Sequence, residues 1–294
     1  MRDILFKNIT TDRIPFTFEN AKGIEVSVLR LDKIHTTISG NKWFKLRFYI
    51  KEAIEQQKKG IVTFGGAYSN HIIATAAVCK LNGLDSIGII RGEEAEILSH
   101  TLQQAKELGM QLHFISRKDY TEKKIPLGLI KEPYYFINEG GYGETGAKGA
   151  ATISEQFNQE NYTHICCAVG TGTMMAGLCN ATSKKITGIS VMKNNLELEG
   201  SVRSLLHDKT KAFDIIHDYH FGGYAKQKPA LINFMNEFYR QTGIPSDFVY
   251  TGRLFFSIAD LIKKDFFEKG SRLLLIHSGG LQGNISLGKG TLIF

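Results

Sequence analysis

The sequence predicts an α/β fold in which helices cover mainly parallel sheets. Short apolar segments with strand character alternate with helical segments along much of the 294 residues, and this alternation is typical of a parallel sheet covered by helices. Glycine-rich turns follow several of the expected strands, at 65–66, 140–146, 170–172 and 279–280. With 43% hydrophobic residues the chain has enough apolar surface for a sizeable core, in one large domain or two smaller ones.

The elements of the first half follow from periodicity and from turn residues. Alternating or continuous apolar runs predict strands, and longer amphipathic runs between them predict helices. The expected strands are 24–31, 60–64, 86–90, 111–115 and 134–137, and the expected helices are 42–57, 72–81 and 94–108. Gly109 is expected to stop the third helix, and 117–124 is expected to be a charged connector.

The second half continues the same alternation. Pro229 stands at the first position of a helical run, where proline is favoured. Expected helices are 147–156, 174–182 and 229–242, and expected strands are 164–169, 186–191 and 273–277.

Composition excludes several classes of function. The formal charge of +7 comes from 36 basic residues scattered among 29 acidic ones, so no basic stripe for nucleic acid is expected. Cys79, Cys166, Cys167 and Cys179 lack the spacing of a zinc site, and their apolar surroundings predict buried, reduced thiols. We expect no metal site.

The chain shows no membrane or secretion signal. Residues 1–7 lack the apolar core of a signal peptide, and no segment offers about eighteen uninterrupted apolar residues. A cytoplasmic protein without membrane contact is therefore expected.

The run Ser39-Gly40-Asn41-Lys42 places a lysine between a flexible turn and a helix. An amine held there and desolvated has a lowered pKa, as reactive lysines require. The alternative is a solvated surface lysine, so other motifs must decide between the two.

A second motif, Gly170-Thr171-Gly172-Thr173, joins a buried strand to a helix. Such a turn presents backbone N–H groups, hydroxyls and the positive end of a helix dipole to one point, which suits a single phosphate. It is neither a Walker loop nor a dinucleotide fingerprint. A tight strand-to-helix turn is the alternative, and that alternative does not explain two threonines.

A third motif, from Gly65 to His71, contains Ser69 and Asn70 in a glycine turn before a helix. Taken alone, Ser69 is equally well explained as a helix N-cap and Asn70 as a turn residue. Together with Lys42 and the phosphate turn, they indicate a phosphate-bearing aldehyde held by a Schiff base, which is pyridoxal 5′-phosphate.

These motifs resemble the D-cysteine desulfhydrase and 1-aminocyclopropane-1-carboxylate (ACC) deaminase group of the tryptophan-synthase-β-like, fold-type II pyridoxal-phosphate enzymes, over nearly the whole chain. The resemblance implies two three-layer α/β domains with the cofactor in the cleft between them. Residues 1–46 plus 147–294 would form the large domain and 47–146 the small one. It also implies a homodimer that acts on a small amino acid.

The same resemblance implies roles for individual residues. Lys42 would carry the cofactor, and Gly170, Thr171, Gly172 and Thr173 would hold its phosphate. Ser69 would reach the substrate carboxylate and the reacting carbon, and Asn70 the 3′ oxygen. His71 stands where deaminases carry glutamine and would face the substrate. Tyr224 and Tyr250 resemble active-site tyrosines that relay a proton near the cofactor.

Two positions discriminate between the reactions of this group. By resemblance, Thr251 lies at the pyridine nitrogen, where ACC deaminases carry glutamate, and Ser278 replaces their leucine. A hydroxyl leaves that nitrogen largely neutral and the electron sink weaker, which suits β-elimination better than the opening of a cyclopropane ring.

The predicted activity is therefore β-elimination from D-cysteine or a related small D-amino acid. Lys42 or a neighbouring group would take the α-proton, hydrosulfide would leave, and the released aminoacrylate would hydrolyse to pyruvate and ammonia. Three alternatives stay open: an ACC deaminase that yields 2-oxobutyrate, a racemase or β-replacement synthase of the same fold, and a non-catalytic phosphate- or nucleotide-binding module.

Overall fold

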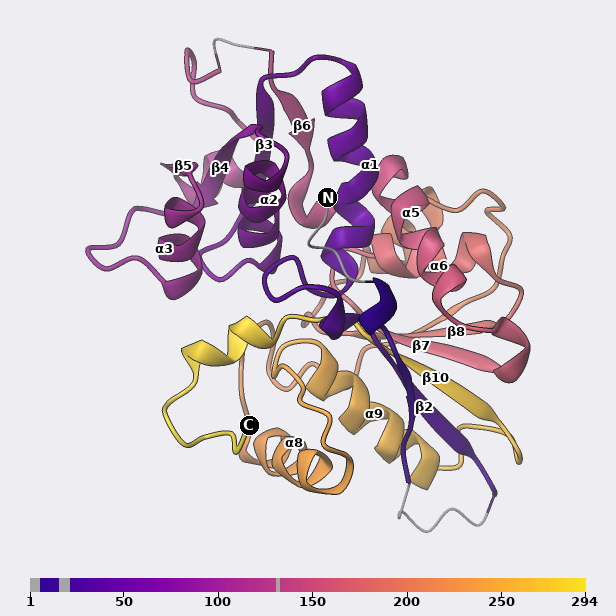
Figure 1. The fold of residues 1–294 in the computed structure, drawn as a ribbon. Helices are drawn as coiled ribbons and strands as arrows, with labels where there is room; N and C mark the ends of the chain where they lie inside the picture. The colour runs from indigo at the N-terminus through magenta and orange to yellow at the C-terminus, as the bar shows by residue number, and fades with distance from the viewer. Residues whose placement is uncertain (1–5, 16–21, 131–132) are drawn as a thin grey trace.

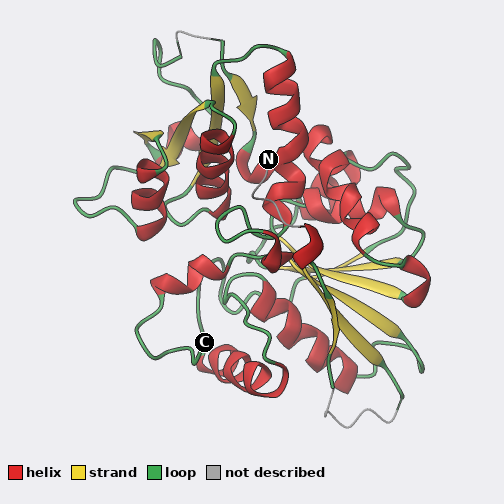
Figure 2. Cartoon of the chain, viewed as in Figure 1, coloured by secondary structure: helices red, strands yellow, loops and turns green. Residues whose placement is uncertain are grey.

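The computed structural model describes residues 6–15, 22–130 and 133–294, and its strands form two sheets (Figures 1 and 2). The larger sheet has the order β1-β2-β10-β7-β8-β9. In this sheet β1 runs antiparallel to β2 and the other neighbours pair in parallel. Its strands are β1 (Thr11–Arg13), β2 (Glu25–Arg30), β7 (His164–Val169), β8 (Lys185–Ser190), β9 (Asp214–Ile216) and β10 (Arg272–His277).

The smaller sheet has four parallel strands in the order β5-β4-β3-β6. They are β3 (Gly60–Gly65), β4 (Asp85–Arg91), β5 (Met110–Ile115) and β6 (Tyr135–Ile137). Two mainly parallel sheets with covering helices confirm the predicted fold class.

The helices cover both sheets and connect them. They are α1 (Asn41–Glu55), α2 (Asn70–Leu81), α3 (His100–Glu107), α4 (Arg117–Thr121), α5 (Glu144–Ala151), α6 (Thr173–Ala181), α7 (Leu198–Ser204), α8 (Pro229–Thr242) and α9 (Thr251–Lys263). Figure 1 shows α1 standing between the small sheet and the pair α5 and α6, while α8 and α9 lie on the other side of the large sheet.

The central strand β7 is buried along its whole length, because helices cover both faces of the large sheet. Its side chains alternate between two cores. Ile165 and Cys167 pack with residues of α1, α5 and α6, whereas Cys166 and Ala168 pack with α9. The four cysteines are buried and free, as predicted.

Several elements differ from the expectation. Helix α3 begins at His100, where Ser99 accepts a hydrogen bond from the Leu102 N–H, and not at 94. The expected connector at 117–124 contains the short helix α4, and β1, β9 and α7 were not expected. The predicted division into domains 1–46 plus 147–294 and 47–146 stays a prediction, and its first boundary lies within α1.

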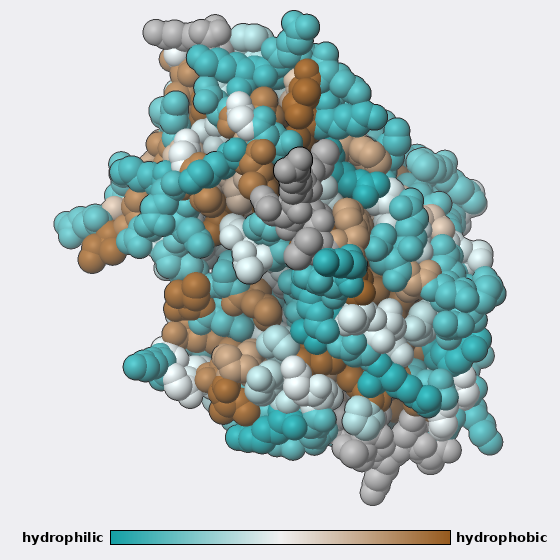
Figure 3. Space-filling model, in the orientation of Figure 1, coloured by the Kyte–Doolittle hydropathy of each residue, from teal (hydrophilic) through white to brown (hydrophobic). Residues whose placement is uncertain are grey.

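The surface in Figure 3 shows apolar residues dispersed among polar ones, with an indentation along the left edge between the upper and lower parts. Within the described ranges, no helix has both the length and the apolar character needed to cross a membrane.

Candidate active site

A cavity of about 300 Å³ is lined by residues from both sheets. The turns at Gly66, Gly140, Gly170 and Gly279 follow strands β3, β6, β7 and β10 and all reach this cavity. Carboxyl ends of parallel strands are where α/β proteins bind ligands, and the volume is at the small end of the usual range for small-molecule sites.

Lys42 lies in the first turn of α1 and lines the cavity. Its Nζ donates to Asn41 Oδ1 at 2.8 Å, and Asn41 Nδ2 lies 3.3 Å from Met174 Sδ. Burial lowers the pKa of Lys42 to about 8, against the opposing attraction of Asp247. A larger fraction of the amine is therefore neutral near neutral pH than for an ordinary lysine, and the neutral form is the nucleophile.

Lys45 lies one helical turn further along the same cavity wall. Its Nζ donates to the Gly140 carbonyl at 2.9 Å. Burial and then the charge of Lys42 lower the pKa of Lys45 well below its ordinary value. Gly140 in turn lies against Thr171, since a Cβ at Gly140 would come within 2.7 Å of Thr171 Cγ2. Lys45 thus holds the turn that faces the phosphate motif.

The phosphate motif lies between β7 and α6, as the sequence indicated. Gly170, Thr171 and Gly172 line the cavity, while Thr173 is fully buried beneath them, with its Oγ1 3.1 Å from Thr171 Oγ1. Gly172 has a φ of +85°, a backbone conformation that L side chains rarely adopt. The first N–H groups of α6 have no partner within the helix and are available to an anion.

Ser69 caps α2 and also lines the cavity. Its Oγ accepts from the N–H groups of His71 at 3.2 Å and Ile72 at 3.4 Å. Both contacts use lone pairs, so the hydroxyl proton stays free to donate. The capping role and the predicted substrate contact are therefore compatible.

Asn70 and His71 open α2 beside Ser69 and also line the cavity. Asn70 Oδ1 accepts from Gln282 Nε2 at 3.0 Å, which orients the amide. His71 Nε2 lies 2.8 Å from Thr63 Oγ1, and its Nδ1 is buried without a partner among the described residues. The His71 ring thus packs against β3, so its predicted contact with the substrate stays a prediction.

Tyr224 and Tyr250 both line the cavity, with ring centroids 6.3 Å apart and planes at 73°. Burial raises the pKa of both phenols. Each phenol therefore keeps its proton at neutral pH and can donate it.

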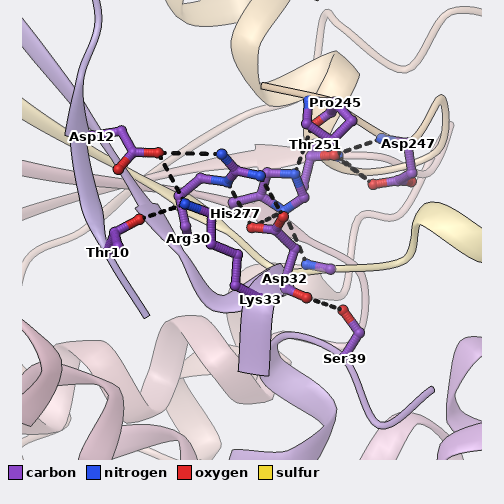
Figure 4. Close-up of polar contacts among 11 residues, drawn as sticks. Thr10, Asp12, Arg30, Asp32, Lys33, Ser39, Pro245, Asp247, Thr251 and His277 are labelled. Carbon is purple, nitrogen blue, oxygen red and sulfur yellow. Dashed lines mark hydrogen bonds and ion pairs between the residues drawn. The ribbon is translucent and has the colours of Figure 1, made fainter. Parts of the chain in front are cut away.

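Thr251 lies beside the cavity but is not among the residues that line it. Its Oγ1 donates to Asp247 Oδ2 at 2.7 Å and accepts from the Asp247 N–H at 2.8 Å (Figure 4). Its predicted contact with the pyridine nitrogen therefore stays a prediction, whereas Ser278 does line the cavity.

A charged network surrounds His277, the residue that precedes Ser278 (Figure 4). Arg30 binds both carboxylate oxygens of Asp32, at 2.8 and 2.7 Å, and reaches Asp12 at 3.2 Å. His277 Nε2 lies 2.8 Å from the Pro245 carbonyl, and its Nδ1 lies 3.5 Å from Asp32. The network ties the end of β10, and with it Ser278, to the preceding loops.

The residues fit pyridoxal 5′-phosphate. The amine of Lys42, with a pKa of about 8, lies on one side of the cavity. The backbone N–H groups at the start of α6, in the turn that follows β7, reach the same cavity. No group of three or more His, Cys, Asp or Glu in the described ranges could hold a metal ion. The amine can bind an aldehyde, and the backbone N–H groups can bind a phosphate.

Comparison with known proteins agrees with the site. The family described as "Pyridoxal-phosphate dependent enzyme" matches residues 17–279, so the chain belongs to that family. It is an enzyme of the ACC deaminase and D-cysteine desulfhydrase branch, and its cofactor is pyridoxal 5′-phosphate.

Two relatives and two solved structures illustrate the similarity. The chain is 30% identical over 294 residues to "Bifunctional D-cysteine desulfhydrase/1-aminocyclopropane-1-carboxylate deaminase, mitochondrial" of Arabidopsis thaliana, covering 89% of this chain and 73% of that one. It is 28% identical over 288 residues to "Putative 1-aminocyclopropane-1-carboxylate deaminase" of Pyrococcus horikoshii, covering 90% and 87%. A solved ACC deaminase homologue superposes with a TM-score of 0.81 at 26% identity, covering 94% and 90%. A hydrogen sulfide-producing enzyme of Fusobacterium nucleatum shares the fold, with a TM-score of 0.68 at 16% identity, covering 94% and 96%.

The structure adds residues that motif reasoning did not assign. Asn41 holds the Lys42 amine, Gln282 holds Asn70, and Arg91 and Glu139 line the cavity from the small sheet. Asn41 lies inside the motif Ser39–Lys42, and Gln282 lies two residues after the glycine turn at 279–280. The neighbouring residues therefore gave a signal for both. Arg91 is the last residue of β4 and Glu139 lies just after β6, and the sequence around them gave no such signal.

Proposed function

We propose that the protein is a β-elimination lyase that acts on D-cysteine or a related small D-amino acid and releases hydrogen sulfide, pyruvate and ammonia. The observation that carries the proposal is the identity of the polar groups that line the cavity. Ser278 supplies a small hydroxyl there, and no lining carboxylate in the described ranges is free of partners.

The carboxylates near the cavity already have ion-pair or hydrogen-bond partners within the protein. Glu139 lines it but binds Lys123 Nζ at 2.9 Å. Asp247 lies in an adjoining cavity, and its two oxygens accept from the N–H groups of Val249, Tyr250 and Thr251 and from the Thr251 hydroxyl. A pyridine nitrogen that meets a hydroxyl and no free carboxylate stays largely neutral. This supports elimination over ring opening, with Ser278 in the cavity lining and the predicted contact of Thr251 with the nitrogen still a prediction.

Different residues of the chain would bind different parts of the cofactor. Lys42 would carry the cofactor, the start of α6 would hold its phosphate, and Asn70 would orient its ring oxygen. When bound, pyridoxal 5′-phosphate supplies an electron sink for the bond to the substrate α-carbon.

Proton handling would fall to the groups around Lys42. Its neutral amine would accept the α-proton, and the free hydroxyl proton of Ser69 would anchor the substrate carboxylate. Tyr250 and Tyr224, both protonated, would supply a proton to the departing sulfur. Hydrosulfide would leave with the bonding electron pair, and hydrolysis of the remaining enamine would give pyruvate and ammonia.

The test is incubation of the purified holoprotein with D-cysteine, L-cysteine, D-serine and ACC while sulfide, pyruvate and 2-oxobutyrate are measured. We expect sulfide and pyruvate from D-cysteine, and loss of both in Lys42→Ala. The matched control is Lys51→Ala, an exposed lysine on the same helix, which should keep full activity. Turnover of another amino acid without sulfide from D-cysteine would refute the proposal.

ACC deamination is the second candidate, because relatives such as the Pyrococcus horikoshii protein carry that name. Formation of 2-oxobutyrate from ACC in the same assay would favour it and would mean that Ser278 does not set the reaction. The homodimer stays a prediction, to be checked by sedimentation.

A further inference from the structure

Arg253 is completely buried in α9, three residues after Tyr250. It forms no ion pair with any carboxylate in the described ranges. Its three guanidinium nitrogens instead donate to five backbone carbonyls. These are Phe248 (3.2 Å), Val191 (2.7 Å), His220 (2.8 Å), Gly223 (2.9 Å) and Lys226 (2.8 Å). All five donors of the side chain are thereby used.

The loop that supplies three of these carbonyls has an unusual backbone. Phe221, Gly222, Gly223 and Ala225 all have positive φ, at 51°, 99°, 124° and 54°. Such conformations are disfavoured for residues with a Cβ and persist only where surrounding contacts impose them. Tyr224 stands in the middle of this run and lines the cavity.

The carbonyls come from three segments that each lead to the cavity wall. Gly223 precedes Tyr224, Val191 precedes Met192, and Phe248 stands two residues before Tyr250. Tyr224, Met192 and Tyr250 all line the cavity. The buried guanidinium of Arg253 therefore connects the backbone segments that carry Tyr224 and Tyr250.

We propose that Arg253 is a positioning residue that imposes the left-handed loop 221–225 and so holds Tyr224 opposite Tyr250 in the cavity. Arginine suits this task because its planar fork carries five donors in fixed directions, whereas lysine carries three donors on one atom. The proposal deepens the proposed function, on which it rests for the catalytic use of the phenols. The arrangement of the loop itself does not depend on the substrate.

The first readout is independent of activity. Hydrogen–deuterium exchange of amides 220–226 is measured in the holoprotein for the wild type and for Arg253→Lys. We expect exchange to be at least about tenfold faster in the variant, because the carbonyls lose donors that close the loop. The control Phe267→Leu alters a buried ring beside His164, at the opposite end of β7 from the cavity, and should leave these amides unchanged.

The second readout separates positioning from general destabilisation. In the wild-type background, Arg253→Lys should lower kcat at least about tenfold, since a positioned proton donor contributes that much or more. In a Tyr224→Phe background the same substitution should lower kcat less than about twofold, because the group it positions is already gone. If Arg253→Lys does not fold, Gly223→Ala disturbs the same carbonyl, because the φ of 124° at Gly223 is disfavoured for a residue with a Cβ, and both readouts apply to it.

Unchanged exchange of amides 220–226, or an equal loss of kcat in both backgrounds, would overturn the proposal. Activity is followed with whichever amino acid the wild type turns over. Failure of D-cysteine as a substrate would thus refute the proposed function alone, and the exchange experiment would still decide the role of Arg253.

Discussion

Replacement of Lys42 by methionine is expected to stabilise the cofactor-free protein at neutral pH. Burial lowers the pKa of Lys42 from its ordinary 10.5 to about 8. Below pH 8 the amine is charged in both the folded and the unfolded chain, so the folded state bears the full desolvation penalty. Between pH 8 and 10.5 the folded protein has released the proton and the unfolded chain retains it, so stability rises with pH. Above 10.5 the penalty is gone.

The size of the effect follows from the same two values. A pKa that falls from 10.5 to about 8 corresponds to about 3 kcal/mol of folding free energy at pH 7. The variant also loses the hydrogen bond to Asn41 Oδ1, a loss of about 1 kcal/mol. The net expectation at pH 7 is therefore a gain of about 2 kcal/mol.

The assay is urea denaturation of the wild type and Lys42→Met, both without cofactor, at pH 7, 8.5 and 10.5. The difference between the two proteins is the quantity of interest, because other titrating groups cancel from it. The gain should shrink steadily from pH 8 upward and be absent by pH 10.5. Lys51→Met, on the exposed face of the same helix, should change stability by less than about 0.5 kcal/mol throughout. A variant that is destabilised at pH 7, or whose gain does not depend on pH, would refute the desolvation argument.

Two glycines make further predictions. Gly149→Ala should destabilise the protein by about 2 kcal/mol, because the new Cβ would lie 2.0 Å from the Phe44 carbonyl where α1 and α5 pack. Its control in denaturation experiments is Gly200→Ala, with nothing within 4 Å, which should stabilise by about 1 kcal/mol through helix propensity. Gly172→Ala should weaken cofactor binding at least about tenfold by distorting the start of α6; a dissociation constant equal to that of the wild type, measured by absorbance titration, would contradict this role.

Residues held by short-range structure could be predicted from the sequence. Lys42, Ser69 and the turn 170–173 each lie where one strand or turn passes directly into one helix, so the local chain alone determines their setting. The cavity brings them together because the carboxyl ends of β3, in the small sheet, and of β7, in the large sheet, both reach it. Thr251 shows the limit of this reasoning, since the sequence did not indicate that its hydroxyl donates to the carboxylate of Asp247.

By itself, therefore, the sequence determined the α/β class, the cofactor and the local motifs that we propose hold it, because strand period, helix period and turn chemistry are properties of neighbouring residues. The tertiary structure alone decided which polar groups are free. In the sequence Arg253 ends a segment, 247–253, that was expected to interrupt two helices, and only the fold places it in α9 and brings carbonyls from residues 191 to 248 around it. The same holds for the pKa of Lys42, because burial and the proximity of Asp247 arise from packing between distant segments.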